Sequence, residues 1–170
     1  WRGYELNLID TPGHVDFSYE VSRSLAACEA AILLVDAQQG IQAQTISNTR
    51  NALSLGLTII PVINKIDLPN IDIKKREDEL CNLLGFKREE IVKVSGKTGE
   101  NVPLLLDEII EKTPSPKGDS TKALEALIFD SFYDEHKGVI IAVRIFNGKI
   151  RKEDLRKYDL FLLRKGDSLK

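Results

Sequence analysis

The spacing of apolar residues along residues 1–113 changes repeatedly between a strand pattern and a helix pattern. Continuous apolar runs, which are typical of strands buried on both faces of a sheet, occupy residues 30–35 and 58–63. The alternating stretch at residues 4–9 and the short apolar run at residues 91–94 predict two further strands. The stretches between these runs repeat apolar residues at helical spacing, and we expect helices over residues 15–28, 42–55, 73–84 and 103–112.

This alternation of strands and helices predicts an α/β fold with a parallel sheet, helices on both faces and right-handed crossovers. Ligands of such sheets bind outside the carboxyl ends of the strands. Polar clusters follow Ile9, Val35, Ile63 and Val94, which are the last residues of the four expected strands. The agreement between cluster and strand end is stronger evidence for a binding site than any one cluster.

The pattern changes after residue 113. Residues 114–121 contain two prolines and a glycine, which cannot continue a helix, and we expect a linker there. The runs that follow are rich in Ile, Val and Phe and predict strands over residues 124–132, 139–146 and 158–163. The chain is therefore expected to comprise one domain over residues 1–113 and part of a second, β-rich domain over residues 122–170.

Composition narrows the class of protein. Apolar residues make up 42% of the chain and charged residues 29%, which is ordinary for a soluble globular protein. No run approaches the length of a membrane span. Cys28 and Cys81 lack metal-type spacing, so we expect free thiols in a reducing cytosol and no disulfide partner. We also expect a monomer. The chain begins at Trp1 and contains no methionine, and we expect it to be a fragment.

Charge is distributed unevenly. Residues 144–170 hold nine Lys or Arg and four Asp or Glu, although the whole chain carries a net charge of −2. A basic end of this kind suits RNA. An ordinary solvated surface explains the same charges, and charge alone favours that interpretation.

The first cluster, Asp10-Thr11-Pro12-Gly13-His14, has the chemistry of a magnesium and phosphate site. The Asp10 carboxylate can hold Mg²⁺ through water, because hard cations prefer oxygen ligands. Gly13 lacks a side chain, so its backbone N–H can approach a terminal phosphate closely. His14 can position a water for in-line attack on that phosphate. A plain β-turn explains this cluster equally well when it is taken alone.

The second cluster, Asn64-Lys65-Ile66-Asp67, suits a guanine base. Guanine presents two adjacent donors, N1–H and the exocyclic amine, and the Asp67 carboxylate can accept both. Adenine presents an acceptor at N1 and would be rejected. Asn64 can tie neighbouring loops together and contact the base, and the alkyl stem of Lys65 can cover the ring. The alternative is a polar turn, which the presence of the first cluster makes less favoured.

Two further clusters carry weaker signals. The backbone N–H groups of Ser95-Gly96-Lys97 could donate to the guanine O6 atom, although this composition is common in loops. The segment Asp36-Ala37-Gln38-Gln39-Gly40 is interpreted as a structural turn that precedes the next helix. His136 has no partner at metal-ligand spacing and is expected to be an exposed turn residue.

These clusters resemble those of a known family. Asp10-Thr11-Pro12-Gly13-His14 and Asn64-Lys65-Ile66-Asp67 are similar to the third and fourth motifs of translational GTPases, and Ser95-Gly96-Lys97 is similar to the fifth. The stretch from Ala126 to Asp134, continuing through Gly138-Val139-Ile140, resembles the opening of the second domain of the LepA, or elongation factor 4, family. The resemblance extends to about Lys152.

The resemblance implies a P-loop GTPase-type domain followed by the start of a β-barrel, and a ribosome-dependent GTPase of elongation that acts as a back-translocase or fidelity factor. It implies GTP or GDP and Mg²⁺ as ligands, with Asp10 in the magnesium site and His14 orienting the hydrolytic water. The implied partners are the ribosome, with its rRNA and tRNA. Family members are cytoplasmic and are also found peripherally at the inner face of the bacterial membrane.

The chain departs from the family pattern in three places. Gly96 stands where alanine is usual, and the match becomes uncertain after Ile150. The 170 residues contain no Gly-x-x-x-x-Gly-Lys-[Ser/Thr] segment, and the switch-I threonine is also missing. We therefore expect the domain over residues 1–113 to lack its phosphate-binding loop and switch I, and the piece alone to bind GTP weakly or not at all.

Two other interpretations stay open at this point. The chain could belong to another GTPase built on the same module, such as elongation factor G or a sulfate-activation GTPase, against which the segment from Phe129 to Gly138 argues. It could also be a non-catalytic adaptor for RNA or protein. Asp10, His14 and Asp67 argue against an adaptor, because a decayed site has no need of them.

Overall fold

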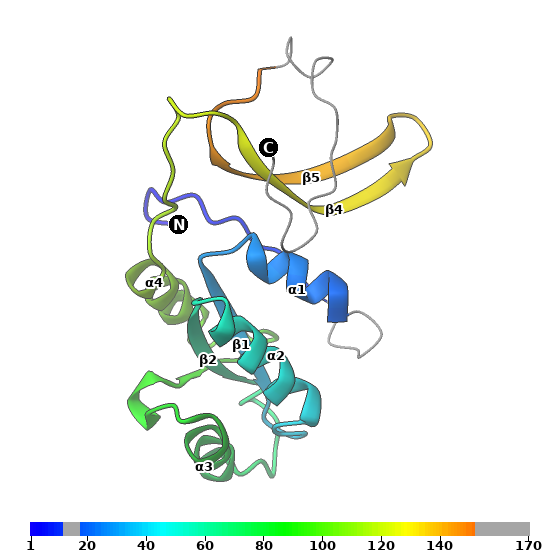
Figure 1. Cartoon of the computed structure of the whole chain (residues 1–170). Coiled ribbons are helices and arrows are strands. Elements are labelled where there is room, and N and C mark those ends of the chain that lie inside the picture. Colours follow the sequence, from blue (N-terminus) through cyan, green and yellow to red (C-terminus); the bar gives the residue numbers. More distant parts are fainter. Residues whose placement is uncertain (12–17, 152–170) are drawn as a thin grey trace.

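The computed structural model describes residues 1–11 and 18–151. Its first part is built on a parallel sheet whose strands are ordered β1-β2-β3 (Figure 1). The strands are β1 (Ala30–Asp36), β2 (Thr58–Asn64) and the short β3 (Val92–Lys93). Side chains of the central strand β2 are buried on both faces, as its continuous apolar run predicts.

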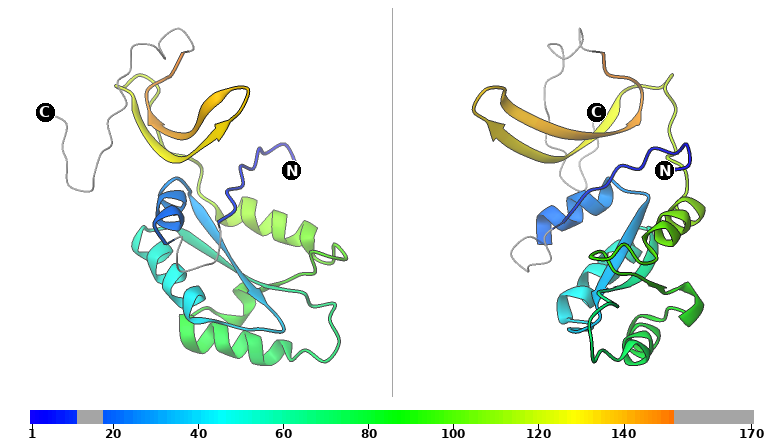
Figure 2. Two further views of the ribbon diagram at one scale, coloured as in Figure 1. Left: turned by 90° about the vertical axis from the view of Figure 1, so that its right-hand side faces the viewer. Right: turned by 180° about the vertical axis from the view of Figure 1, so that it is seen from behind.

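Helices cover both faces of this sheet, as expected (Figure 2). Helix α2 (Ala43–Ser54) contacts both α1 (Ser18–Ala26) and α3 (Ile73–Leu84), so these three share one face, and α4 (Val102–Lys112) covers the other. The 3-10 helix η2 (Arg88–Glu90) precedes β3. None of the helices in the described part of the chain is both long and apolar enough to cross a membrane.

The core has two halves, one on each side of the sheet. On the α3 side, Val35 and Ile63 pack with Leu80 of α3. On the α4 side, Ile60 and Val62 are fully buried with Leu105 and Ile109 of α4 against them, in a group that also includes Val92 and Val94. Because side chains alternate along a strand, neighbouring residues of β2 supply the two halves.

The ends of α3 are where its sequence signals place them. The Asp72 carboxylate accepts a hydrogen bond from the Lys75 backbone N–H at 2.9 Å, which caps the first turn. Gly85 follows the last turn with φ of 77°, in the left-handed region that glycine adopts at little cost. Helix α1 ends at Ala26, slightly before its expected end.

The prediction of a strand over residues 4–9 is wrong. The described residues 1–11 form no strand, and Tyr4, Leu6 and Leu8 are exposed. A strand is held by the backbone groups of a neighbouring strand, and the sheet pairs β1 only with β2. Alternation of apolar residues gave the correct period for a strand here but could not supply a pairing partner.

The second part is an antiparallel hairpin of β4 (Glu125–Asp134) and β5 (Gly138–Asn147). Its turn is closed by the Asp134 carboxylate, which accepts hydrogen bonds from the backbone N–H groups of His136 and Lys137 at 2.9 and 2.8 Å. His136 is exposed in this turn, as expected. The further strand expected over residues 158–163 lies outside the described residues.

The segment between α4 and β4 packs against the base of the hairpin. The Asp119 backbone N–H donates to the Asn147 side-chain oxygen, and the Gly148 N–H donates to the Asp119 carbonyl, both at 2.9 Å. A Cβ at Gly118 would lie 2.3 Å from the Phe146 carbonyl oxygen, so a larger residue does not fit. The segment is therefore fixed to the hairpin by specific contacts.

Helix α1 and Glu29, just beyond its end, contact the hairpin. Arg23 donates from its guanidinium to the Ile128 carbonyl of β4 at 2.7 Å. Arg144 of β5 pairs with Glu29, just beyond α1, and its guanidinium lies over the Phe146 ring. Burial raises the pKa of the adjacent Cys28 thiol, so this thiol is not activated as a nucleophile.

Candidate guanine-recognition site

Three of the four polar clusters meet at the carboxyl edge of the sheet. Asp36 and Asn64 are register partners at the ends of β1 and β2, and the Ala37 N–H donates to the Asn64 carbonyl at 2.9 Å. The Ile66 N–H donates to the carbonyl of Val94, beyond β3, at 3.3 Å. Parallel pairing therefore brings the loops after β1, β2 and β3 side by side.

Asn64 joins two of these loops through its side chain. Its amide oxygen accepts from the Lys65 backbone N–H at 2.8 Å and from the Gly96 backbone N–H at 2.9 Å. A Cβ at Gly96 would lie 3.6 Å from the same oxygen, an ordinary contact. Alanine would fit at this position, so the difference from the family's usual residue leaves this hydrogen bond unchanged.

Asp67 is oriented by the hydroxyl of Ser95. The Ser95 Oγ accepts from the Thr98 backbone N–H at 3.1 Å, so its hydroxyl hydrogen is directed to the Asp67 carboxylate, 2.6 Å away. Ser95 is fully buried, whereas Asp67 is only partly buried. The hydrogen bond from Ser95 lowers the pKa of Asp67 below its ordinary value, so the carboxylate is ionised at neutral pH.

The backbone N–H groups of Ser95 and Gly96, expected to donate to guanine O6, have partners within the protein. The Ser95 N–H donates to the Glu100 carbonyl at 3.0 Å, and the Gly96 N–H donates to Asn64. Both hydrogen bonds stabilise the shape of the loop after β3. Lys97 is the remaining member of the cluster and is exposed.

The loop after β1 contributes a charged partner that the sequence did not indicate. The Lys65 ammonium lies 2.6 Å from the Asp36 carboxylate, across the ends of β1 and β2. Lys65 has a positive φ of 68°, which places its backbone in the left-handed region. The interpretation of Asp36 as a turn residue was incomplete, because spacing along the chain could not reveal a contact across strands.

The first cluster is described only in part. Asp10 is exposed in the unpaired segment that precedes residue 12, while Gly13 and His14 lie outside the described residues. The structure therefore does not bring Asp10 to the same sheet edge through strand pairing. Among residues 1–11 and 18–151, no three His, Cys, Asp or Glu side chains gather as they would around a metal ion.

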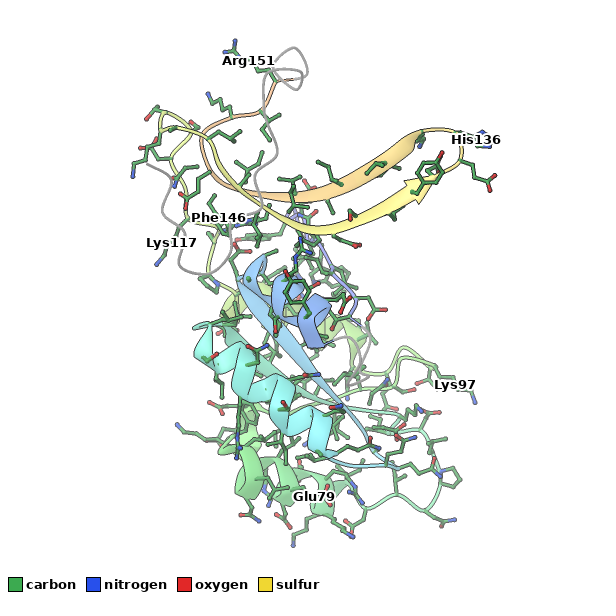
Figure 3. The ribbon with its side chains drawn as sticks, turned by 45° about the vertical axis from the view of Figure 1, so that its right-hand side comes forward. Glu79, Lys97, Lys117, His136, Phe146 and Arg151 are labelled. Atoms are coloured by element: carbon green, nitrogen blue, oxygen red, sulfur yellow. The ribbon has the colours of Figure 1, made fainter. Side chains whose placement is uncertain are left out.

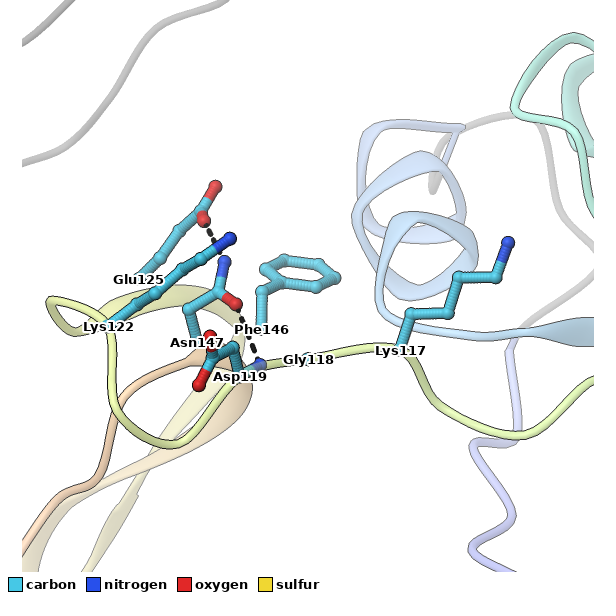
Figure 4. A pocket seen from close by; sticks show the side chains of 7 residues that line it. All are labelled: Lys117, Gly118, Asp119, Lys122, Glu125, Phe146 and Asn147. Carbon is cyan, nitrogen blue, oxygen red and sulfur yellow. Dashed lines mark hydrogen bonds between the residues drawn. The ribbon is translucent and has the colours of Figure 1, made fainter.

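A shallow hollow at the base of the hairpin is separate from these loops (Figure 4). Its lining mixes Lys117 and Lys122 with Asp119 and Glu125 around the Phe146 ring. Figure 3 shows Lys97 beside the parallel sheet and the side chains of Lys117 and Phe146 at the hairpin. The convergent polar chemistry lies at the strand ends, so we base the site on those loops.

The arrangement has the donors and acceptors that one edge of a purine requires. An ionised carboxylate held by a buried hydroxyl can accept two parallel N–H bonds, because each oxygen has two lone pairs. The exposed Lys65 side chain belongs to the same loop, and its ammonium lies 2.6 Å from the Asp36 carboxylate. A carboxylate of this kind is chemically suited to a base with two adjacent donors and unsuited to one with an acceptor there.

Comparison with known proteins is consistent with this chemistry. The family model described as the elongation factor Tu GTP binding domain matches residues 1–115. Elongation factor 4 of Parabacteroides distasonis is 58% identical over 155 residues, which are 91% of this chain and 26% of that protein. Elongation factor 4 of Dehalococcoides mccartyi strain 195 is 53% identical over 167 residues, 98% of this chain and 27% of that protein.

A crystal structure of a protein from Thermus thermophilus has a similar fold. Its TM-score is 0.68 at 19% sequence identity, and the match covers 82% of this chain and 35% of that one. This likeness concerns the fold alone. The chain spans about a quarter of the length of the curated relatives that it matches.

Proposed function

The chain belongs to the elongation factor Tu GTP-binding domain family, and from this membership we propose that its loops after β1, β2 and β3 form the guanine-recognition half of a GTP-hydrolysing site. The observation that carries the proposal is the Asp67 carboxylate, which a buried Ser95 hydroxyl holds ionised and oriented at the carboxyl edge of the sheet. A carboxylate in this position suits the N1–H and amino group of guanine.

Each loop has a separate task in this proposal. Asp67 accepts the two guanine donors, and Asn64 ties the loops together and borders the base. The Lys65 stem covers one ring face. Because the Ser95 and Gly96 N–H groups are engaged within the protein, the Lys97 backbone N–H becomes the donor for guanine O6.

The phosphate end of the site is assigned to the first cluster. The Asp10 carboxylate is exposed, and a carboxylate is a ligand that Mg²⁺ binds directly or through water. We assign the Gly13 N–H to the terminal phosphate and His14 to the hydrolytic water, with GTP as substrate and GDP as product. When bound, Mg²⁺ neutralises charge on the phosphate oxygens.

The activity itself is assigned to a longer protein that contains this chain. We propose a ribosome-dependent GTPase of translation elongation, similar to elongation factor 4, with residues 1–113 in its GTPase domain, 114–121 as linker and 122–170 in a β-barrel domain. The matches to elongation factor 4 favour this over a protein of the elongation factor G type. Its partners are then the ribosome, rRNA and tRNA, and it acts as a cytoplasmic monomer. Peripheral association with the inner membrane face is carried by the family resemblance alone.

Titration with a fluorescent GTP analogue tests this division of labour. We expect the 170-residue chain not to saturate at micromolar analogue, because it has no Gly-x-x-x-x-Gly-Lys-[Ser/Thr] segment to hold the phosphates. The longer protein should bind at micromolar concentration or below, and ribosomes should stimulate its GTP hydrolysis.

An ATP analogue is the control for base selection in both titrations. Micromolar binding by the chain alone would refute the need for a phosphate loop. A longer protein that binds ATP and GTP equally, or that hydrolyses no GTP on ribosomes, would refute the proposed function.

A further inference from the structure

The ion pair between Asp36 and Lys65 lies within the proposed guanine site but has no part in the recognition described above. Asp36 is the last residue of β1, and Lys65 is the first residue after β2. The Lys65 ammonium is 2.6 Å from Asp36 Oδ2, with the lysine side chain 51% exposed and the aspartate side chain 19% exposed. A lysine this exposed has room to move toward other partners.

The Asp36 carboxylate is held in place by its own turn. The Oδ1 atom accepts from the backbone N–H groups of Gln38 at 2.7 Å and Gln39 at 3.3 Å. The backbone carbonyl of Asp36 accepts from the Gly40 N–H at 2.8 Å. The other oxygen, Oδ2, is left to meet Lys65. The hydrogen bond from Lys65 and those from the turn together hold the pKa of Asp36 below its ordinary value. Asp36 is thus a fixed anion, whereas the more exposed Lys65 side chain has fewer contacts that fix its position.

Lys65 is also close enough to Asp67 for their charges to interact. Both Lys65 and Lys97 act electrostatically on the Asp67 carboxylate, and both lower its pKa. Asp67 is two residues from Lys65 and is only partly buried. Because Lys65 and Asp67 are two residues apart on one loop and a lysine side chain is a flexible four-carbon stem, an ammonium released from Asp36 can turn toward Asp67, the acceptor proposed for guanine.

We propose that Asp36 is a positioning residue that holds the Lys65 ammonium away from Asp67, so that the Asp67 carboxylate stays available to guanine. The ion pair removes a competitor, because an ammonium on Asp67 would occupy the lone pairs that the base requires. It also holds the Lys65 stem extended between two strand ends, where it can border the base. This inference rests on the proposed function.

The test measures GDP affinity in the longer protein for Asp36→Asn, Lys65→Gln and the double variant. Asp36→Asn should weaken GDP binding about two- to fivefold, the effect expected of a partly exposed ion pair. In the double variant the Asp36 change should cause no additional loss relative to Lys65→Gln, because the competing ammonium is gone. The loss in Asp36→Asn should also shrink in about 0.5 M salt, which screens the Lys65–Asp67 attraction.

Asp78→Asn is the matched control, since it removes the same charge from the surface ion pair between Asp78 of α3 and Arg88 of η2, and GDP affinity should not change. Additive losses in the double variant, or a loss that is independent of salt, would mean that Asp36 acts only on loop structure and would overturn the inference. So would Asp36→Asn binding GDP as the unchanged protein does. Failure of the unchanged protein to bind GDP would instead overturn the proposed function.

Discussion

Replacing Asp67 with asparagine should change the base that the site prefers from guanine to xanthine. The carboxylate accepts two hydrogen bonds, whereas a carboxamide accepts with one atom and donates with the other. Guanine then faces a donor with its own amino group, while xanthine presents a carbonyl oxygen at that position. We expect GDP affinity of the longer protein to fall about 10- to 100-fold, the range for losing a bidentate base contact.

Competition between GDP, xanthosine diphosphate and ADP measures this change. Xanthosine diphosphate should bind the Asp67→Asn variant more tightly than GDP does, and ADP should bind neither protein well. Asp107→Asn, on α4, makes the same chemical change where Asp107 contacts the first residues of the chain, and should leave the order of affinities unchanged. An Asp67→Asn variant that keeps its preference for GDP would show that Asp67 does not read the base.

Truncating Leu80 to alanine should lower the free energy of unfolding substantially. Leu80 is fully buried between α3 and the sheet, beside Val35 and Ile63. Removing a buried leucine side chain loses transfer free energy and leaves a cavity, which costs about 2–5 kcal/mol. Helix α3 follows the loop that contains Asn64 and Asp67. Weaker packing of α3 on the sheet should therefore also loosen that loop.

Urea unfolding of the 170-residue chain measures this cost. Leu83→Ala is the control on the same helix. Because Leu83 is 54% exposed, its truncation should lower the free energy of unfolding much less than the truncation of Leu80 does. Equal decreases in the free energy of unfolding in the two variants would contradict the packing of α3 on the sheet. A loss of unfolding free energy in Leu80→Ala that exceeds the loss in Leu83→Ala by about 1 kcal/mol or more would support this packing.

The elements that the sequence predicted well were those whose signals are local. The continuous apolar runs of β1 and β2 and the glycine after α3 are properties of neighbouring residues, and the structure places these elements close to the expected ranges. The segment over residues 4–9 has an equally clear local pattern and is not a strand. Whether a strand forms depends on a partner elsewhere, and local periodicity carries no information about that partner.

The same distinction applies to the site. The sequence placed Asn64, Asp67 and Ser95 at strand ends, and parallel pairing gathered them at one edge. It assigned Ser95 a backbone role, whereas the buried hydroxyl makes the contact to Asp67. It also missed the Asp36–Lys65 pair. Both contacts join loops from different strands, so only the register of the sheet reveals them.

The most direct test of guanine recognition at these loops is a crystal structure of the longer protein with GDP bound. We predict that the Asp67 carboxylate accepts hydrogen bonds from guanine N1–H and the amino group, with Ser95 Oγ still donating to Asp67 and Lys65 still paired with Asp36. A guanine base bound elsewhere, with no contact to Asp67, would contradict the assignment of these loops to guanine recognition.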